Sequence, residues 1–112
     1  MKNQPVYITD ILEAIEKIQA LSDGIDFDVF MKEVSIHDAI MYNFIVIGEA
    51  SNRLTNEFKN QNSSVEWYKL KGMRNHLAHS YDEINYELVW ETIKDDLPNL
   101  KSQIRIIINK YK

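Results

Sequence analysis

The chain has 112 residues, of which 45% are hydrophobic and 27% charged. This length suits one domain of ordinary size, and we expect residues 1–112 to form a single helical domain. The absence of cysteine excludes a disulfide framework and a thiolate metal site. Three glycines and two prolines leave little room for the many turns of an all-β fold.

The net charge of −4 argues against a broad electrostatic grip on nucleic acid, which needs a basic face. Any such contact must come from a local patch, for which Lys69, Lys71 and Arg74 are the candidates. The first residues lead into an amphipathic segment and do not form a signal peptide. No apolar run approaches the roughly 20 residues that span a bilayer. We therefore expect a cytoplasmic protein that has no membrane partner.

The first half of the chain predicts three helices. Apolar residues recur at helical spacing over residues 6–22, and Gly24 is expected to end this first helix because glycine tolerates a positive φ. A short second helix follows Asp26 and covers the core with its aromatic residues. Residues 35–38, with the pattern Ser-x-x-Asp, form a capping box with Asp in place of the usual Glu. They begin a long third helix that reaches about Phe58.

The third helix is apolar on two sides. Met41, Ile45 and Gly48 add a second apolar side to the stripe that faces the core. A helix of this kind either lies at the centre of a bundle or also covers a partner. Gly48 would let another backbone come close, because it has no side chain. Glu49 and Arg53 are four residues apart and suit a simple surface pair.

The second half predicts a fourth helix and a final, interrupted one. Residues 59–64 are polar and form a loop, and residues 63–66, with the pattern Ser-x-x-Glu, form a second capping box. After the fourth helix a turn ends at Asn85, which is a plausible cap. Pro98 interrupts the last helical pattern, so we expect a kink or two helices that meet near Asp96. The pattern as a whole predicts an all-α antiparallel bundle of four main helices plus a short one.

The fourth helix ends in the chain's densest cluster of chemically competent side chains. Arg74 is always protonated and has a planar fork of donors that suits phosphate. His76 and His79 can exchange a proton near neutral pH, and Asn75 and Tyr81 add an amide and a phenol. An arginine and a histidine that converge could cleave a phosphodiester without metal. The plainer interpretation is a solvated helix end, with cations near the C-terminal dipole.

The spacing within this cluster limits which side chains can meet. In a regular helix five residues amount to ~140° of rotation, so Arg74 and His79 do not share one side. Asn75 and His79, four residues apart, do share a side. Convergence of Arg74 and His79 requires the long arginine side chain, fraying near His79, or a second copy of the chain.

A metal site or a nucleotide-hydrolysing site is weakly supported. His76 and His79 could bind metal together with a carboxylate such as Asp82, but they are three residues apart and no H-E-x-x-H or cysteine spacing accompanies them. No glycine-rich phosphate loop is present. We expect neither a metal nor another cofactor.

The same residues resemble a known family. The pattern Arg-x4-His-x-Tyr, which runs from Arg74 to Tyr81, resembles the signature of the HEPN superfamily. The flanking sequence over residues 72–81 resembles, more narrowly, the HepT branch of that superfamily. Residues 89–90 (Val-Trp) and 96–98 (Asp-Leu-Pro) fit the same branch, so the resemblance extends over nearly the whole chain.

The resemblance implies a fold and an activity. HEPN proteins are helical bundles that form homodimers, and both copies of the motif line one cleft. Members of the HepT branch are ribonuclease toxins of bacterial and archaeal toxin–antitoxin pairs. The implied catalytic residues are Arg74, which would stabilise charge on the phosphate, and His79, which would transfer protons. Asn75 would support them by orienting His79 or the phosphate.

The resemblance also implies a partner and leaves alternatives open. In type VII pairs of the HepT/MntA kind, a minimal nucleotidyltransferase antitoxin adds AMP to the motif tyrosine, here Tyr81. One alternative is a catalytically inactive HEPN subunit that binds substrate for a nucleotidyltransferase, although the intact Arg74, His79 and Tyr81 weigh against it. Another alternative is a purely structural dimeric α-bundle.

Overall fold

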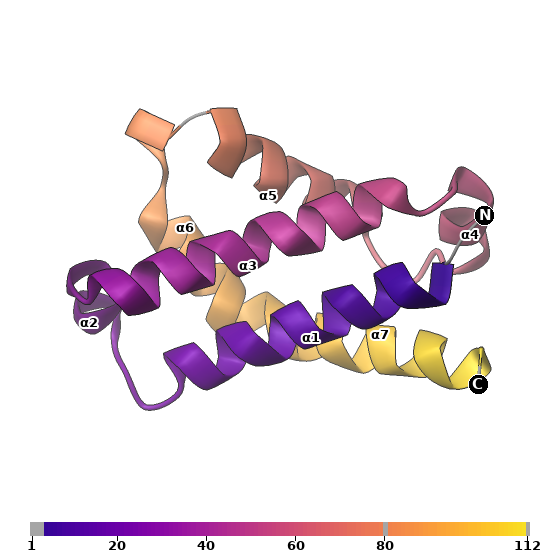
Figure 1. Cartoon of the computed structure of the whole chain (residues 1–112), viewed down its shortest axis with the longest axis horizontal. Helices are drawn as coiled ribbons and strands as arrows, with labels where there is room; N and C mark the ends of the chain where they lie inside the picture. The colour runs from indigo at the N-terminus through magenta and orange to yellow at the C-terminus, as the bar shows by residue number, and fades with distance from the viewer. Residues whose placement is uncertain (1–3, 80, 112) are drawn as a thin grey trace.

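Four long helices run in alternating directions (Figure 1). They are α1 (Gln4–Ser22), α3 (Val34–Arg53), α5 (Trp67–His79) and α7 (Leu97–Lys110). The computed structural model describes residues 4–79 and 81–111, without the side chain of residue 81. Within these residues the secondary structure is helical, with no strand. The expected all-α antiparallel bundle is therefore confirmed.

The core lies between the four long helices. α3 packs between α1 and α5, and α7 lies along α1 (Figure 1). The buried side chains are mostly those whose spacing predicted the helices: Ile8, Ile11, Ile15 and Ile18 from α1, Ile40, Phe44 and Ile47 from α3, Leu77 from α5, and Ile104 and Ile107 from α7. The helical periodicity thus correctly predicts which face of each long helix is inside.

The short helix α2 (Phe27–Lys32) closes one end of the bundle. Gly24 has a φ of 74° and ends α1, as expected. The Asp26 carboxylate accepts a hydrogen bond from the Val29 amide at 2.9 Å, which caps the new helix. Phe30 is fully buried and stacks on Trp90 with 5.3 Å between ring centroids. The predicted role of α2 as a cover over the core is confirmed.

The predicted bounds of the third helix are wrong at both ends. α3 begins at Val34 after Glu33, whose side chain makes no capping bond, so Ser35 lies within the helix. At the other end Leu54 is extended, with a φ of −71° and a ψ of 142°. The Thr55 hydroxyl then accepts a hydrogen bond from the Phe58 amide at 3.0 Å and caps a separate helix. A threonine that can cap competes with helix continuation.

That separate helix, α4 (Asn56–Gln61), also shortens the predicted loop. α5 begins at Trp67, so the predicted capping box at Ser63 is wrong as well. The Trp67 indole N–H donates to the carbonyl of Asn62 at 3.2 Å. This local bond, between residues five apart, lies at the start of α5, where a capping box was expected.

The last part of the chain is interrupted where Pro98 predicts it. A 3-10 turn, η1 (Tyr81–Glu83), precedes α6 (Tyr86–Glu91), and the Asn85 side chain accepts from the Leu88 amide at 3.0 Å as the expected cap. A π-helical turn, η2 (Thr92–Asp96), joins α6 to α7, with Pro98 in the first turn of α7. The two helices therefore meet at Asp96, as predicted. In the described ranges no helix is both long enough and apolar enough to cross a bilayer.

Candidate active site on α5

α5 crosses α3 at the point where Arg74 lies over Gly48. A Cβ atom added to Gly48 would lie 2.6 Å from the Cγ of Arg74 and closer still to its Cβ. The two helices can approach this closely only because residue 48 has no side chain. The expectation that Gly48 admits a close neighbour is confirmed, and that neighbour is the stem of the motif arginine.

Two oxygen atoms hold the Arg74 guanidinium. Nη2 lies 2.9 Å from Oε2 of Glu49, and Nη1 donates to Oδ1 of Asn75 at 3.1 Å. The Arg74 side chain is 25% exposed, and its Nε is buried with no hydrogen-bond partner among the described residues. Charge-assisted bonds of this kind fix the direction of the guanidinium.

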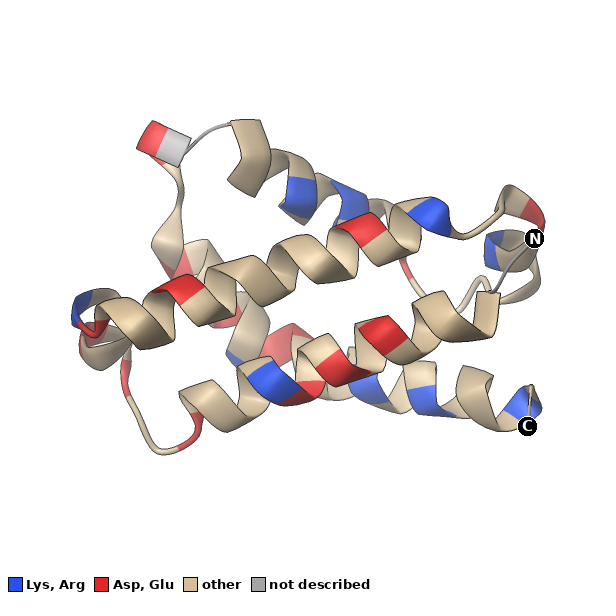
Figure 2. Cartoon of the chain, in the orientation of Figure 1, with Lys and Arg blue, Asp and Glu red and all other residues tan. Residues whose placement is uncertain are grey.

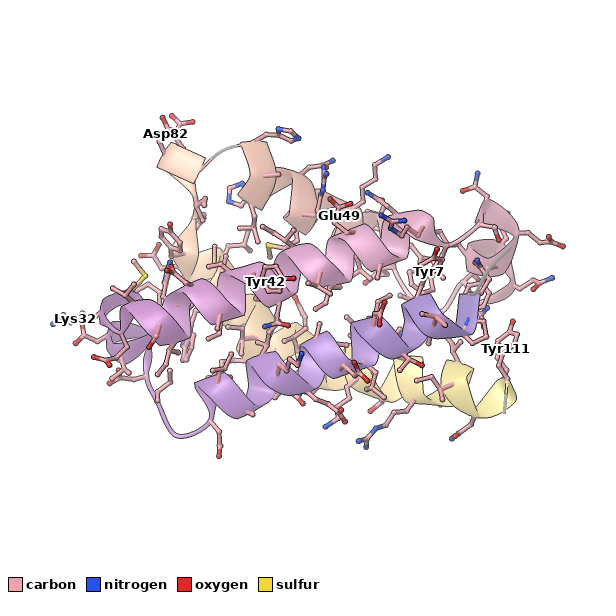
Figure 3. All side chains as sticks on the ribbon, in the orientation of Figure 1. Tyr7, Lys32, Tyr42, Glu49, Asp82 and Tyr111 are labelled. Carbon is pink, nitrogen blue, oxygen red and sulfur yellow. The ribbon has the colours of Figure 1, made fainter. Side chains whose placement is uncertain are left out.

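Glu49 is the residue that sequence reasoning missed. Its spacing suggested a surface pair with Arg53, but its carboxylate instead binds Arg74 across the helix crossing. Figure 3 labels Glu49 on α3 at the level where α5 passes behind it. The available signal was its position next to Gly48, since a glycine that admits a neighbouring helix also brings the next residue close to that helix.

His79 is the last residue of α5, and its side chain is exposed. No hydrogen bond or ion pair joins it to Arg74 within the described part of the chain. The side chain of Arg74 points toward α3, whereas His79 lies at the C-terminal end of α5. Asn75 shares a side with His79, but its amide contacts Arg74. A single chain therefore holds the two motif side chains apart.

His76 has a structural partner. Its Nε2 accepts a hydrogen bond from the Asn85 amide at 3.1 Å, which requires the neutral ring with the proton on Nδ1. This bond ties the start of α6 to α5. Among the residues that the structure describes, no group of three or more His, Asp or Glu side chains could hold a metal ion together.

The backbone of Tyr81 lies in η1, two residues beyond His79. Its side chain is outside the described residues. Asp82 and Glu83 follow it in η1 and are exposed, so this turn is acidic (Figure 2).

Two basic side chains of α5, Lys69 and Arg74, already pair with acidic residues. Lys69 lies 3.0 Å from Glu66, and this hydrogen bond and charge raise the pKa of Lys69. Partial burial, and secondarily the charge of Lys71, lower the pKa of Lys59. The charges of Lys59 and Lys71 therefore repel each other, and no acidic residue pairs with either of them among the described residues.

A groove of about 430 Å³ lies between α1 and α3 beside this site. Tyr7, Tyr42, Glu49 and Arg53 line it, and Figure 3 shows the first three along the front of the two helices. Tyr42 is 66% exposed. Glu49 thus has the groove on one side and Arg74 on the other.

The comparisons with known proteins support the resemblance to the HepT branch. A family model described as "Ribonuclease HepT-like" matches residues 11–107. A protein of Caldanaerobacter subterraneus subsp. tengcongensis, named as a candidate RNase, is 36% identical over 112 residues, which is 100% of both chains. Another named as a candidate RNase, from Methanocaldococcus jannaschii, is 33% identical over 101 residues, 90% of this chain and 93% of the other.

A Thermococcus cleftensis protein with the name "Probable ribonuclease HepT" is 34% identical over 97 residues, 87% of this chain and 88% of the other. No solved structure matches the chain at a significant level. The family match covers most of the chain, and these relatives align over nearly their full length. The chain therefore belongs to the HepT-like ribonuclease family.

Proposed function

We propose that the protein is a metal-independent endoribonuclease whose reaction depends on Arg74 and His79. The observation that supports this most directly is the way Arg74 is held. Its side chain is three-quarters buried and its guanidinium is oriented by Glu49 and Asn75, on the same helix that ends at the exposed His79. A preorganised cation and an exposed imidazole, brought to one phosphate, suit a reaction that builds charge on that phosphate.

The proposed chemistry is transfer of the phosphate to the neighbouring 2′-oxygen. One His79 accepts the proton of the 2′-hydroxyl, and the oxygen forms a bond to phosphorus. The bond from phosphorus to the 5′-oxygen breaks, and a protonated His79 supplies the proton that this oxygen takes up. Arg74 stabilises the negative charge on the non-bridging oxygens. The products are a 2′,3′-cyclic phosphate and a 5′-hydroxyl.

We further propose that the working unit is a homodimer. Arg74 and His79 lie on different sides of α5, so a second copy is the simplest way to bring an arginine and two histidines to one phosphate. A two-fold interface places equal residues across its axis. The half-exposed strip of α3 beside the α1–α3 groove, with Tyr42 and Val46, supplies apolar surface for such a contact next to Glu49.

The ribonuclease proposal is tested by the rates of matched variants. RNA is incubated in EDTA with wild type, Arg74→Ala, His79→Ala and the control Arg105→Ala. Arg105 pairs with Glu16 on the far side of the bundle. We expect each site variant to lose roughly 100-fold or more of the rate, because each lacks proton transfer or charge stabilisation. Arg105→Ala should keep the wild-type rate. Full activity of both site variants would exclude the mechanism.

The biological role that we propose is that of a cytoplasmic toxin neutralised by a minimal nucleotidyltransferase antitoxin, which adds AMP to Tyr81. The negative charge and bulk of AMP beside Arg74 and His79 would exclude an RNA phosphate. Mass spectrometry of the co-expressed pair should find added AMP on the peptide that contains Tyr81, and Tyr81→Phe should stay toxic. If the partner neutralises Tyr81→Phe as well as wild type, neutralisation works by binding alone.

A further inference from the structure

A second cavity lies on the opposite side of α5 from the Arg74–Glu49 contact. It has a volume of about 450 Å³ and lies between α5 and the segment that consists of α6, η2 and α7. This volume is within the range of small-molecule sites, roughly 300–1,000 Å³. Its apolar floor comes from the core: Phe44, Ile47 and Leu97. Such a floor can accept a flat, uncharged ring.

The rim on the α7 side consists of hydrogen-bond acceptors. Asp95 and Asp96 come from the π-helical turn, a type of distortion that often marks functional sites. Asp96 immediately precedes α7, yet its side chain makes no capping bond, so its carboxylate is not used by the helix. Gln103 donates from Nε2 to the Ser64 carbonyl at 2.8 Å, which leaves its Oε1 as a further acceptor.

The rim on the α5 side supplies donors from Lys69 and His76, and it also holds the Glu66 carboxylate, which lies 3.0 Å from Lys69. Lys69 lines the cavity, and the hydrogen bond to Glu66, the charge of Glu66 and, less strongly, the charge of Asp96 raise the pKa of its amine. His76 also lines the cavity, and the bond from the Asn85 amide to Nε2 leaves the proton on Nδ1. Acceptors and donors therefore face each other across an apolar floor.

The cavity lies on the side of α5 that includes His79. Gly72 lines the cavity and is seven residues before His79, so the two differ by only ~20° of rotation and ~10 Å along the helix. A strand whose phosphate lies at His79 can thus place a nearby base at this cavity. An added Cβ at Gly72 would meet no atom within 4 Å, so the approach along this strip is open.

We propose that this cavity, the base pocket, binds one unstacked guanine of the RNA strand that is cut at Arg74 and His79. Single-stranded RNA is generally read through such splayed bases. Guanine has two adjacent donors, N1–H and the 2-amino group, that match one carboxylate, and the acceptors O6 and N7 that match Lys69. Uracil has a single N–H donor. The negative charge of the acidic rim also repels the RNA phosphates, so only the uncharged base enters the cavity. This inference rests on the proposed function.

The test measures base preference in two matched ways. The substrates are oligoribonucleotides that differ only in one nucleoside near the cleaved bond, which is guanosine, inosine or uridine. Each substrate is cut by wild type, Asp95→Asn, Asp96→Asn and the control Asp23→Asn. Asp23 is an exposed residue of the turn after α1, remote from the base pocket. Binding of the same sequences with 2′-O-methyl sugars, which cannot be cut by 2′-oxygen attack, is measured in parallel by fluorescence anisotropy.

We expect wild type and Asp23→Asn to prefer guanine over inosine and uracil, in both kcat/KM and affinity. At least one of the two pocket variants should reduce that preference by about tenfold or more, since a good bidentate base contact is lost. Two results would overturn the base pocket and leave the ribonuclease proposal standing: cleavage without any base preference, or a preference that neither pocket variant changes. A groove that binds a protein segment would give the same results. No cleavage of any RNA by wild type overturns both.

Discussion

Arg74 depends on its neighbours for both space and direction. Gly48 provides the space, since a Cβ there would overlap the arginine stem, and Glu49 provides the direction through its 2.9 Å contact with Nη2. An added methyl group at position 48 must therefore push α5 away or displace Arg74. This makes two adjacent residues of α3 part of the candidate site, although neither belongs to the motif.

The matched variants Gly48→Ala and Gly72→Ala test the space requirement. Gly48→Ala should lower the free energy of unfolding by about 1–3 kcal/mol, because overpacking outweighs the gain in helix propensity. Gly72→Ala meets nothing within 4 Å and should stabilise the protein by up to about 1 kcal/mol. Urea denaturation measures both changes. Equal effects of the two substitutions would mean that the close crossing does not exist.

In the proposed reaction Glu49 acts through Arg74, so variants of Glu49 should differ by how well they hold the guanidinium. Glu49→Gln keeps an oxygen acceptor, whereas Glu49→Ala leaves Asn75 as the remaining partner. We expect Glu49→Ala to lose about tenfold to 100-fold in kcat, with a smaller change in KM, because misplacement of a catalytic group affects the chemical step. Glu49→Gln should recover part of the loss. If the two variants are equally active, Glu49 does not position Arg74.

At this scale the sequence correctly predicted that Gly48 admits a close neighbour. The roles of the motif residues, which a local pattern also singled out, stay a prediction. The sequence did not predict the Glu49–Arg74 contact. That pair is 25 residues apart in the chain and depends on how α5 crosses α3. A spacing rule connects Glu49 only with residues of its own helix, such as Arg53.

The predictions of helices that rest on periodic apolar spacing are the most accurate, and those that rest on capping patterns are the least accurate. The apolar spacing located the four long helices and Pro98 located the break at Asp96. The boxes at Ser35 and Ser63 were both wrong, while Thr55, which has no such box, caps α4. Capping patterns are short and common, so other contacts of the folded chain, such as the Trp67–Asn62 bond, decide where a helix begins.

Two substitutions test this account of the helix ends. Thr55→Ala removes the acceptor for the Phe58 amide and should lower the free energy of unfolding by about 1 kcal/mol. Ser63→Ala should leave it within about 0.5 kcal/mol, because Ser63 caps no helix and is exposed. Thermal or urea denaturation compares them. A larger loss for Ser63→Ala than for Thr55→Ala would contradict the observed helix bounds.

For the whole molecule, the separation of Arg74 and His79 leads to the prediction of a dimer. Light scattering at micromolar concentration should give twice the mass of the chain. Tyr42→Glu, on the exposed side of α3, should weaken association because it places a charge in the proposed apolar interface. The control Tyr68→Glu alters an equally exposed tyrosine at the start of α5 and should not. A monomeric wild type would exclude the shared cleft.

The most direct test of the central claim examines how RNA is cut. An oligoribonucleotide is incubated with the protein in EDTA, and the same sequence with a single 2′-deoxy sugar at the cleaved position serves as the comparison. We predict 2′,3′-cyclic phosphate and 5′-hydroxyl ends from the first, by mass spectrometry, and no cut at that position in the second, because the attacking oxygen is missing. Products with 3′-hydroxyl and 5′-phosphate ends, or continued cleavage of the deoxy substrate, would contradict the proposed roles of Arg74 and His79.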